Sequence, residues 1–206
     1  MEQPNQITKT DLRTPIVWAN QECMWTSVPK NANMAYRRLC RAVDMPKQKY
    51  IGQTATYSIC VVRNPVHRLF SGLGEFIRRH KQKELPITLL EKLLDNADNF
   101  DEHLEPQIVY LQNKSYTHIL SFENLVEETL QVPYFAKNEQ IVKLCIRQPV
   151  PDKSKYFSHS IDEIYKYYSP LIDDIINKYY FKDVILWQNR EKYVGQILDY
   201  DSITVN

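Results

Sequence analysis

Two short segments of this chain place polar or cationic side chains directly after an apolar run. The first is Pro29-Lys30-Asn31-Ala32-Asn33, which follows the predicted buried strand 23–28 and precedes a predicted helix over 33–43 that Asn33 would cap. The first turn of a helix has unpaired N–H groups and the positive end of the helix dipole, and Lys30 adds a full charge. The segment therefore predicts an anion site, although a lysine in an ordinary surface turn is the alternative. It is not a Walker A loop, because the glycines and the Lys-Ser/Thr pair are missing.

The second segment starts with Arg63, directly after the apolar run 57–62, and reaches Ser71 eight positions later. Arg63 would lie at the C-terminal end of a strand, where open α/β sheets bind their ligands. Ser71 lies off the apolar stripe of the following predicted helix, so its hydroxyl and the Arg63 guanidinium could reach one phosphate. Each segment alone has an ordinary structural explanation. Together, at the ends of two strands, they predict a site for two phosphates.

The elements that would position these side chains follow from the hydrophobic pattern. Strands are predicted over 23–28, 57–62 and 116–121. Helices are predicted over 33–43, 65–81 (with Asn64 as N-cap), 88–95, 105–111, 123–130, 138–146, 161–180 as two segments broken at Ser169-Pro170, and 190–198. This alternation predicts an α/β protein with a P-loop-like three-layer fold, in which a central, mostly parallel sheet is flanked by helices. Residues 1–15 have the composition of a polar, disordered lead-in, and residues 16–206 are predicted to form one domain.

Composition limits the function further. The net charge of +1 gives no polyanion signature, so no nucleic-acid partner is predicted, and the basic clusters 37–41 and 78–81 are the candidate local anion sites. The four cysteines form no CxxC pair, and no metal site is predicted. No apolar run approaches the ~20 residues of a membrane span. As written, the chain is predicted to be cytoplasmic; a Golgi or secretory location would apply if an N-terminal anchor had been removed. Oligomeric state is not indicated.

Five segments, in order, resemble parts of one enzyme family. Residues 28–39 resemble the 5′-phosphosulfate loop of carbohydrate sulfotransferases of the chondroitin and HNK-1 type, and residues 61–71 resemble the family's 3′-phosphate element. The family's His-Trp-x-Pro, Phe-Glu-x-Leu and closing Tyr-x-x-Asp segments are similar to residues 101–107, 116–125 and 179–186. The resemblance covers roughly residues 23–188. Met34 stands where the family usually has Ser or Thr, and Leu104 replaces its Trp.

The resemblance implies a sulfotransferase-like domain that transfers a sulfuryl group from 3′-phosphoadenosine 5′-phosphosulfate (PAPS) to a hydroxyl acceptor, a carbohydrate. The product would be adenosine 3′,5′-bisphosphate, and no metal would be needed. Lys30 would neutralise charge on the bridging phosphate oxygen. Arg63 and Ser71 would bind the 3′-phosphate. The residues expected to bind the 5′-phosphate or to close over the nucleotide are Asn31, Ala32, Asn33, Met34, Ala35, Lys153 and Ser154.

A general base must take the proton of the acceptor hydroxyl. His103 is the first candidate, because histidine titrates in the useful range and lies in the family-like segment. Glu75, one turn beyond Ser71, is the second. Two other functions stay open at this point. One is a catalytically inactive sulfotransferase-like binding protein, which Met34 favours, and the other is a nucleotide-dependent kinase, which would need a Mg²⁺ ligand.

Overall fold

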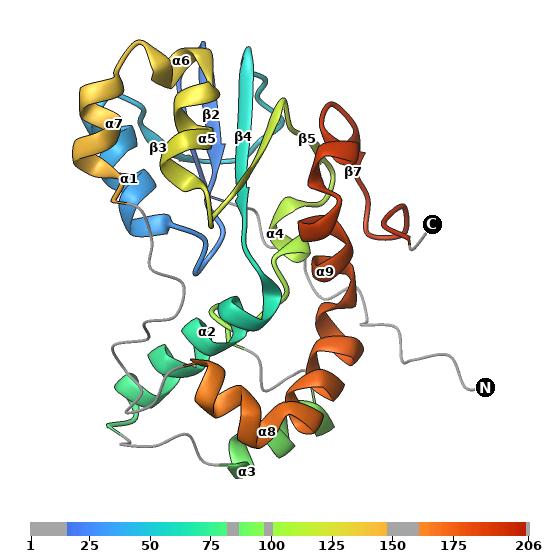
Figure 1. The fold of residues 1–206 in the computed structure, drawn as a ribbon. Helices are drawn as coiled ribbons and strands as arrows, with labels where there is room; N and C mark the ends of the chain where they lie inside the picture. Colours follow the sequence, from blue (N-terminus) through green and yellow to red (C-terminus); the bar gives the residue numbers. More distant parts are fainter. Residues whose placement is uncertain (1–15, 82–86, 97–100, 148–160, 205–206) are drawn as a thin grey trace.

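A five-stranded sheet forms the centre of the molecule. The computed structural model describes residues 16–81, 87–96, 101–147 and 161–204 (Figure 1). The strand order is β3-β1-β2-β4-β6, with β1 Ile16–Ala19, β2 Cys23–Thr26, β3 Lys47–Lys49, β4 Tyr57–Val62 and β6 His118–Ser121. Strands β2, β4 and β6 pair in parallel, while β1 is antiparallel to both β2 and β3. Only β1 therefore runs against the others, which confirms a mostly parallel sheet.

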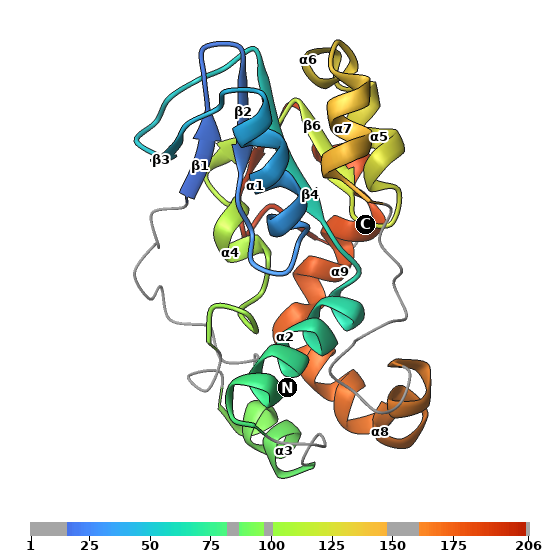
Figure 2. The same ribbon diagram turned by 90° about the vertical axis from the view of Figure 1, so that its left-hand side faces the viewer.

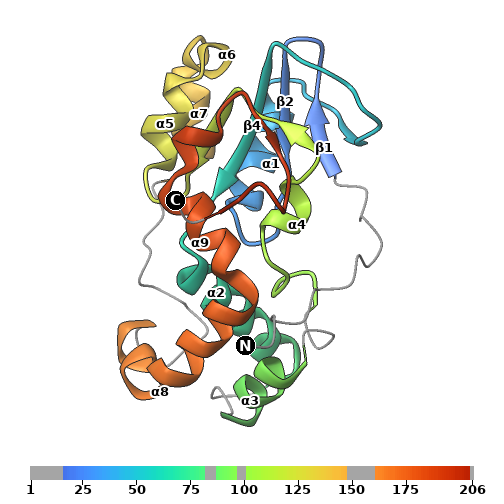
Figure 3. The same ribbon diagram turned by 90° about the vertical axis from the view of Figure 1, so that its right-hand side faces the viewer.

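Helices cover both faces of this sheet, as the alternation along β4 requires. Ile59 and Val61 belong to a core cluster with α1 (Asn33–Ala42), α5 (Leu125–Gln131), α6 (Pro133–Ala136) and α7 (Glu139–Cys145), seen in Figure 2. Cys60 and Val62 point to the opposite face and pack against α4 (Ile108–Leu111), α9 (Phe181–Gln188) and the ribbon of β5 (Lys114–Ser115) and β7 (Ile197–Leu198), seen in Figure 3. The α/β prediction with helices on both faces is confirmed.

A group of helices lies beyond the carboxyl ends of β2 and β4. It consists of α2 (Pro65–Arg79), α3 (Ile87–Asp95), α8 (Ile161–Ile175) and the π-helical turn η2 (Ile176–Tyr180), and it has its own apolar cluster (Figure 1). Helix α2 begins as predicted, since the Asn64 side chain accepts hydrogen bonds from the N–H groups of Val66 and His67 and Pro65 follows it. In the described residues no helix combines the length and the apolar character needed to cross a bilayer.

Two predictions for the C-terminal third are wrong. Helix α8 continues through Pro170 and is not broken at Ser169-Pro170. Pro170 is exposed, so water can reach the carbonyl that the proline leaves unpaired. Ile164 and Ile172, on the other face of the helix, stay buried. Residues 190–198 do not form one helix. A 3₁₀ turn, η3 (Arg190–Tyr193), ends before Gly195, whose φ of +79° is incompatible with a right-handed helix, and β7 follows.

Candidate functional site

The loop between β2 and α1 adopts a strained conformation. Lys30 and Ala32 have φ values of 67° and 60°, the left-handed region that non-glycine residues seldom occupy and that costs about 1–3 kcal/mol per residue. The N-cap of α1 is Ala32, and no side chain caps the helix. The prediction that Asn33 caps it is therefore wrong: Asn33 is the first helical residue, and its Oδ1 accepts a hydrogen bond from Ser27 Oγ at 3.0 Å. An uncapped first turn is a natural anion site.

Arg63 lies at the end of β4 and reaches this loop. Only 7% of the residue is exposed, and its Nη1 donates to the carbonyl oxygen of Lys30 at 3.1 Å. The guanidinium lies 4.2 Å from the centre of the Phe122 ring, and its buried Nε has no hydrogen-bond partner. Burial lowers the pKa of Arg63 to about 10, so it is still a cation at neutral pH. A buried cation with an unused donor is suited to an anionic ligand.

One buried side chain joins the two predicted segments. Gln107 Oε1 accepts hydrogen bonds from Asn31 Nδ2 at 2.7 Å and from the Arg63 N–H at 3.1 Å, and its Nε2 donates to the Arg63 carbonyl at 3.0 Å. Its own N–H donates to Asp183 Oδ2 at 2.7 Å. The loop and the end of β4 are thereby held in one arrangement.

Asn31 supports the loop from within. Its side chain is buried and also donates to the Val61 carbonyl at 2.8 Å, while its N–H donates to the Val28 carbonyl at 3.2 Å. The prediction that the Asn31 N–H binds phosphate therefore needs correction, because that donor is already used. The N–H groups that remain for a ligand belong to the first turn of α1.

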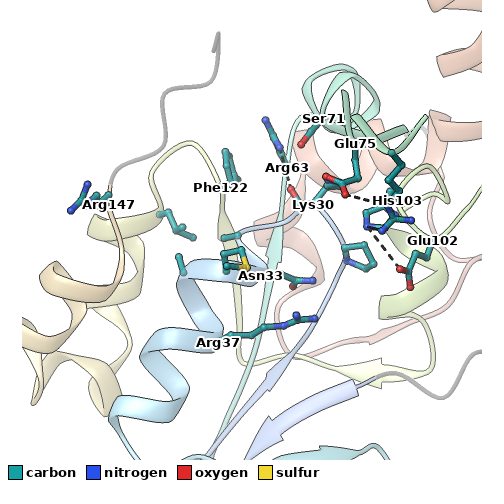
Figure 4. A pocket seen from close by; sticks show the side chains of 16 residues that line it. Lys30, Asn33, Arg37, Arg63, Ser71, Glu75, Glu102, His103, Phe122 and Arg147 are labelled. Carbon is teal, nitrogen blue, oxygen red and sulfur yellow. Dashed lines mark hydrogen bonds and ion pairs between the residues drawn. The ribbon is translucent and has the colours of Figure 1, made fainter. Parts of the chain in front are cut away.

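A cavity of about 630 Å³ lies where β2, β4, α1 and α2 meet (Figure 4). Nine predicted site residues line it: Lys30, Ala32, Asn33, Met34, Ala35, Arg63, Ser71, Glu75 and His103. The other seven lining residues were not predicted individually, although Arg37 and Arg79 belong to the basic clusters predicted as anion sites. They are Pro29, Arg37, Arg79, Glu102, Phe122, Leu125 and Arg147. Lys153 and Ser154 lie outside the described residues. The structure thus brings together side chains that are more than 70 positions apart in the sequence.

The cavity is cationic although the chain as a whole is nearly neutral. Five of its lining residues are basic and two are acidic, whereas the net charge of the chain is +1. The basic residues are Lys30, Arg37, Arg63, Arg79 and Arg147, and the acidic residues are Glu75 and Glu102. Such a concentration of positive charge in a concave site attracts an anionic ligand.

Glu75 forms the centre of an ion-pair network on one side of the cavity. Its carboxylate contacts Arg78, Lys30 Nζ at 3.5 Å and Arg79 Nε at 3.2 Å. The hydrogen bond from Arg78 is the main reason why the pKa of Glu75 falls to about 2. Burial lowers the pKa of Lys30, and Glu75 partly offsets this effect. Glu75 is therefore ionised and a weak proton acceptor, which suits it to hold Lys30 in place.

His103 faces the same network from a different segment. Its Nε2 lies 3.2 Å from Arg79 Nη2, and its Nδ1 lies 3.5 Å from Asp101 Oδ1. Burial, and then the nearby charge of Lys30, lower its pKa below the usual 6.5, so the ring is neutral at pH 7. Gly72 permits this packing, because a Cβ there would lie 2.5 Å from the His103 carbonyl oxygen. A neutral imidazole beside Lys30 can accept a proton.

The residues that sequence reasoning missed differ in the signal they gave. Arg37 and Arg79 belong to the two basic clusters that were noted as candidate anion sites, so helical phase could have selected them. Gln107 gave no signal, because one glutamine in a polar stretch has no distinctive pattern.

Comparison of the chain with protein-family models, with curated proteins and with solved structures finds no match. In the described part of the chain, no three His, Cys, Asp or Glu side chains gather in a way that could hold a metal ion. The interpretation of the cavity therefore depends on its own geometry and charge.

Proposed function

We propose that this protein is a sulfotransferase with a P-loop-like fold, which transfers a sulfuryl group from PAPS to a carbohydrate hydroxyl. The observation that carries the proposal is the convergence of Arg63 and Ser71 with Lys30 and the uncapped start of α1 on one cationic cavity. Two anion-binding elements on adjacent strands match a nucleotide with phosphates at both its 3′ and 5′ positions. ATP has no 3′-phosphate, so this pairing favours PAPS.

Each lining residue has a role under this proposal. The N–H groups at the start of α1 bind the 5′-phosphate, and Arg63 with Ser71 binds the 3′-phosphate. Phe122 provides an apolar surface for the adenine ring of the nucleotide. Phe122 lies on the side of the cavity toward Arg147, away from His103 (Figure 4). The acceptor would therefore enter near His103.

The chemical step needs a proton acceptor and a cation. His103 takes the proton of the attacking hydroxyl while a new oxygen–sulfur bond forms and the bond between sulfur and the 5′-phosphate oxygen breaks. Lys30 neutralises the charge that develops on that phosphate oxygen, and adenosine 3′,5′-bisphosphate leaves. Glu75 is bound by three basic side chains and fixes Lys30 instead of acting as the base.

Thermal denaturation with nucleotides tests the proposal. A ligand that binds only the folded state at about 100 times its Kd stabilises it by about 2.7 kcal/mol, a shift of several degrees in Tm. Adenosine 3′,5′-bisphosphate should give this shift and ADP a much smaller one, and Arg63→Ala should abolish the difference. Arg38→Ala, an exposed site outside the cavity, is the matched control. Equal shifts with both nucleotides, or none, would refute the proposal.

One observation favours a second candidate, an inactive binding protein. Met34 is 66% exposed and lines the cavity at a position where a hydroxyl donor would help to bind the phosphosulfate. Under this candidate the bisphosphate binds, but labelled sulfate is not transferred to any saccharide acceptor. Met34→Ser should strengthen bisphosphate binding about fivefold, the value of one added hydrogen bond, whichever candidate holds. Mg²⁺-dependent binding of ATP would instead support a kinase.

A further inference from the structure

A basic surface extends from the cavity across α1 to the edge of the sheet. On α1 the positions 34, 37, 38 and 41 share one helical face, which carries Met34 and three arginines. Arg38 and Arg41 are exposed, and Arg37 lines the cavity. The face therefore begins at the rim of the candidate site.

The edge strand β3 continues the same surface. Lys47 pairs with Trp18 and Lys49 with Ile16 in the antiparallel β1–β3 ladder, so both lysines lie on the Trp18 side of the sheet. Trp18 belongs to the core cluster that packs against α1, and the Arg41 guanidinium lies 5.7 Å from the centre of its ring. Helix α1 and the two lysines thus lie on the same side of the sheet. Figure 2 shows α1 in front of the sheet, with β3 at the edge of the sheet.

Among the described residues, no carboxylate neutralises the charge on this basic face. None of its five cations, Arg37, Arg38, Arg41, Lys47 and Lys49, forms an ion pair with a carboxylate in the residues that the structure describes. Asp44, just beyond α1, is the acidic residue closest to them in the sequence. Charge complementarity therefore calls for an anionic partner.

The exposed apolar residues indicate what kind of partner. Ile51, two positions after β3, is 86% exposed, and Met34 at the start of α1 is 66% exposed. No aromatic residue occupies the exposed positions of the basic face, so it lacks the rings on which nucleic-acid bases stack. Aliphatic side chains beside clustered lysines and arginines are the combination that binds an anionic bilayer, since the cations contact headgroups and the apolar groups enter the interface.

We propose that the basic face of α1 and β3 docks the protein on an anionic lipid bilayer, with Ile51 inserted at the interface. Met34 and Arg37 belong to both the basic face and the cavity, so docking would bring the rim of the cavity to the lipid surface. The proposal does not depend on sulfotransferase activity.

Vesicle sedimentation tests the proposal with the full chain. The protein should bind vesicles of phosphatidylcholine with phosphatidylserine, and salt should release it, whereas vesicles of phosphatidylcholine alone should not bind it. Each cation near such a surface is worth about a factor of five, so Arg38→Glu/Lys49→Glu should lower the partition coefficient at least about 25-fold. Ile51→Ser should weaken binding without changing its salt dependence.

Two exposed lysines elsewhere give the matched control. Lys166→Glu/Lys192→Glu changes the net charge by the same amount on α8 and η3 and should leave partition nearly unchanged. Equal loss in both double variants would mean that net charge alone drives binding and would overturn the proposal. So would equal binding to neutral vesicles, or retention on heparin or RNA without binding to anionic vesicles. Nucleotide-induced shifts in Tm should persist in all three variants, which separates this test from that of the proposed function.

Discussion

The carboxamide of Gln107 binds both backbone groups of Arg63: its Oε1 accepts from the Arg63 N–H at 3.1 Å and its Nε2 donates to the Arg63 carbonyl at 3.0 Å. The same Oε1 accepts from Asn31 Nδ2 at 2.7 Å. One side chain therefore sets the distance between the loop that follows β2 and the cation that follows β4. In the proposed function these are the two phosphate subsites, so their spacing determines which nucleotide fits.

Gln107→Met keeps the volume of this side chain but removes its hydrogen bonds. We expect a loss of about 2–4 kcal/mol in the free energy of unfolding, because buried groups of Arg63 and Asn31 are left without partners. We also expect the preference for adenosine 3′,5′-bisphosphate over 5′-AMP to shrink, as titration calorimetry would measure. Gln131→Met, at an exposed position, is the control. A lower stability with an unchanged preference would mean that Gln107 has only a structural role.

Gly72→Ala should reverse the usual effect of this substitution. In an exposed helix the change stabilises by up to about 1 kcal/mol, because glycine has the greater backbone entropy to lose. Here the new Cβ would lie 2.5 Å from the His103 carbonyl oxygen and 2.7 Å from Leu104 Cδ2, so α2 and the 103–104 segment must separate. We expect a destabilisation of about 1–3 kcal/mol in chemical denaturation, with a larger loss of turnover than of nucleotide affinity. Unchanged stability would contradict the close packing described above.

The pH dependence should report His103. The pKa of His103 is lowered below 6.5 in the folded protein. Between this lowered pKa and 6.5 the unfolded chain binds more protons than the folded protein does. The free energy of unfolding therefore rises with pH in this range and reaches its full value above about 6.5. If His103 is the base, turnover should fall with acidification only below pH 6.5. His103→Gln should remove this acid limb, and His80→Gln, at the exposed C-cap of α2, should keep it. An acid limb that persists in His103→Gln would assign the base to another group.

The parts of this fold that the sequence predicts are those in which local signals agree with packing. Strand β4 has the predicted bounds, and Asn64 and Pro65 start α2 as expected, because a β-branched apolar run and a capping residue act over a few positions. Strand β3 was missed because its residues, Lys-Gln-Lys, are all exposed and carry no hydrophobic pattern. Its pairing with β1 depends on a tertiary contact that no local window contains.

In the candidate site, too, the sequence predicts the residues that have a local signal and misses those that depend on tertiary contacts. Lys30, Arg63 and Ser71 were predictable because each follows a strand or occupies a defined phase of a helix. The roles of Gln107 and Asp183 depend on hydrogen bonds between segments 76 positions apart, as Gln107 N to Asp183 Oδ2 shows. Asn33 was misassigned as the N-cap because residue type favours asparagine there, whereas the left-handed turn at Ala32 sets the start of α1.

Glu75→Gln distinguishes a base from a positioning residue. The substitution removes a carboxylate from the cavity but keeps its shape, so bisphosphate affinity should rise about threefold to tenfold in calorimetry through reduced repulsion of the phosphates. Turnover should fall only modestly, because His103 still accepts the proton, whereas a loss of about a thousandfold with tighter binding would make Glu75 the base.

In the wild type the pKa of Glu75 is lowered to about 2 from 4.5, so the stability it contributes is present above pH 4.5 and is lost as pH falls toward 2. Acid unfolding of Glu75→Gln should lack this component, while Glu91→Gln, at an exposed position on α3, should retain it.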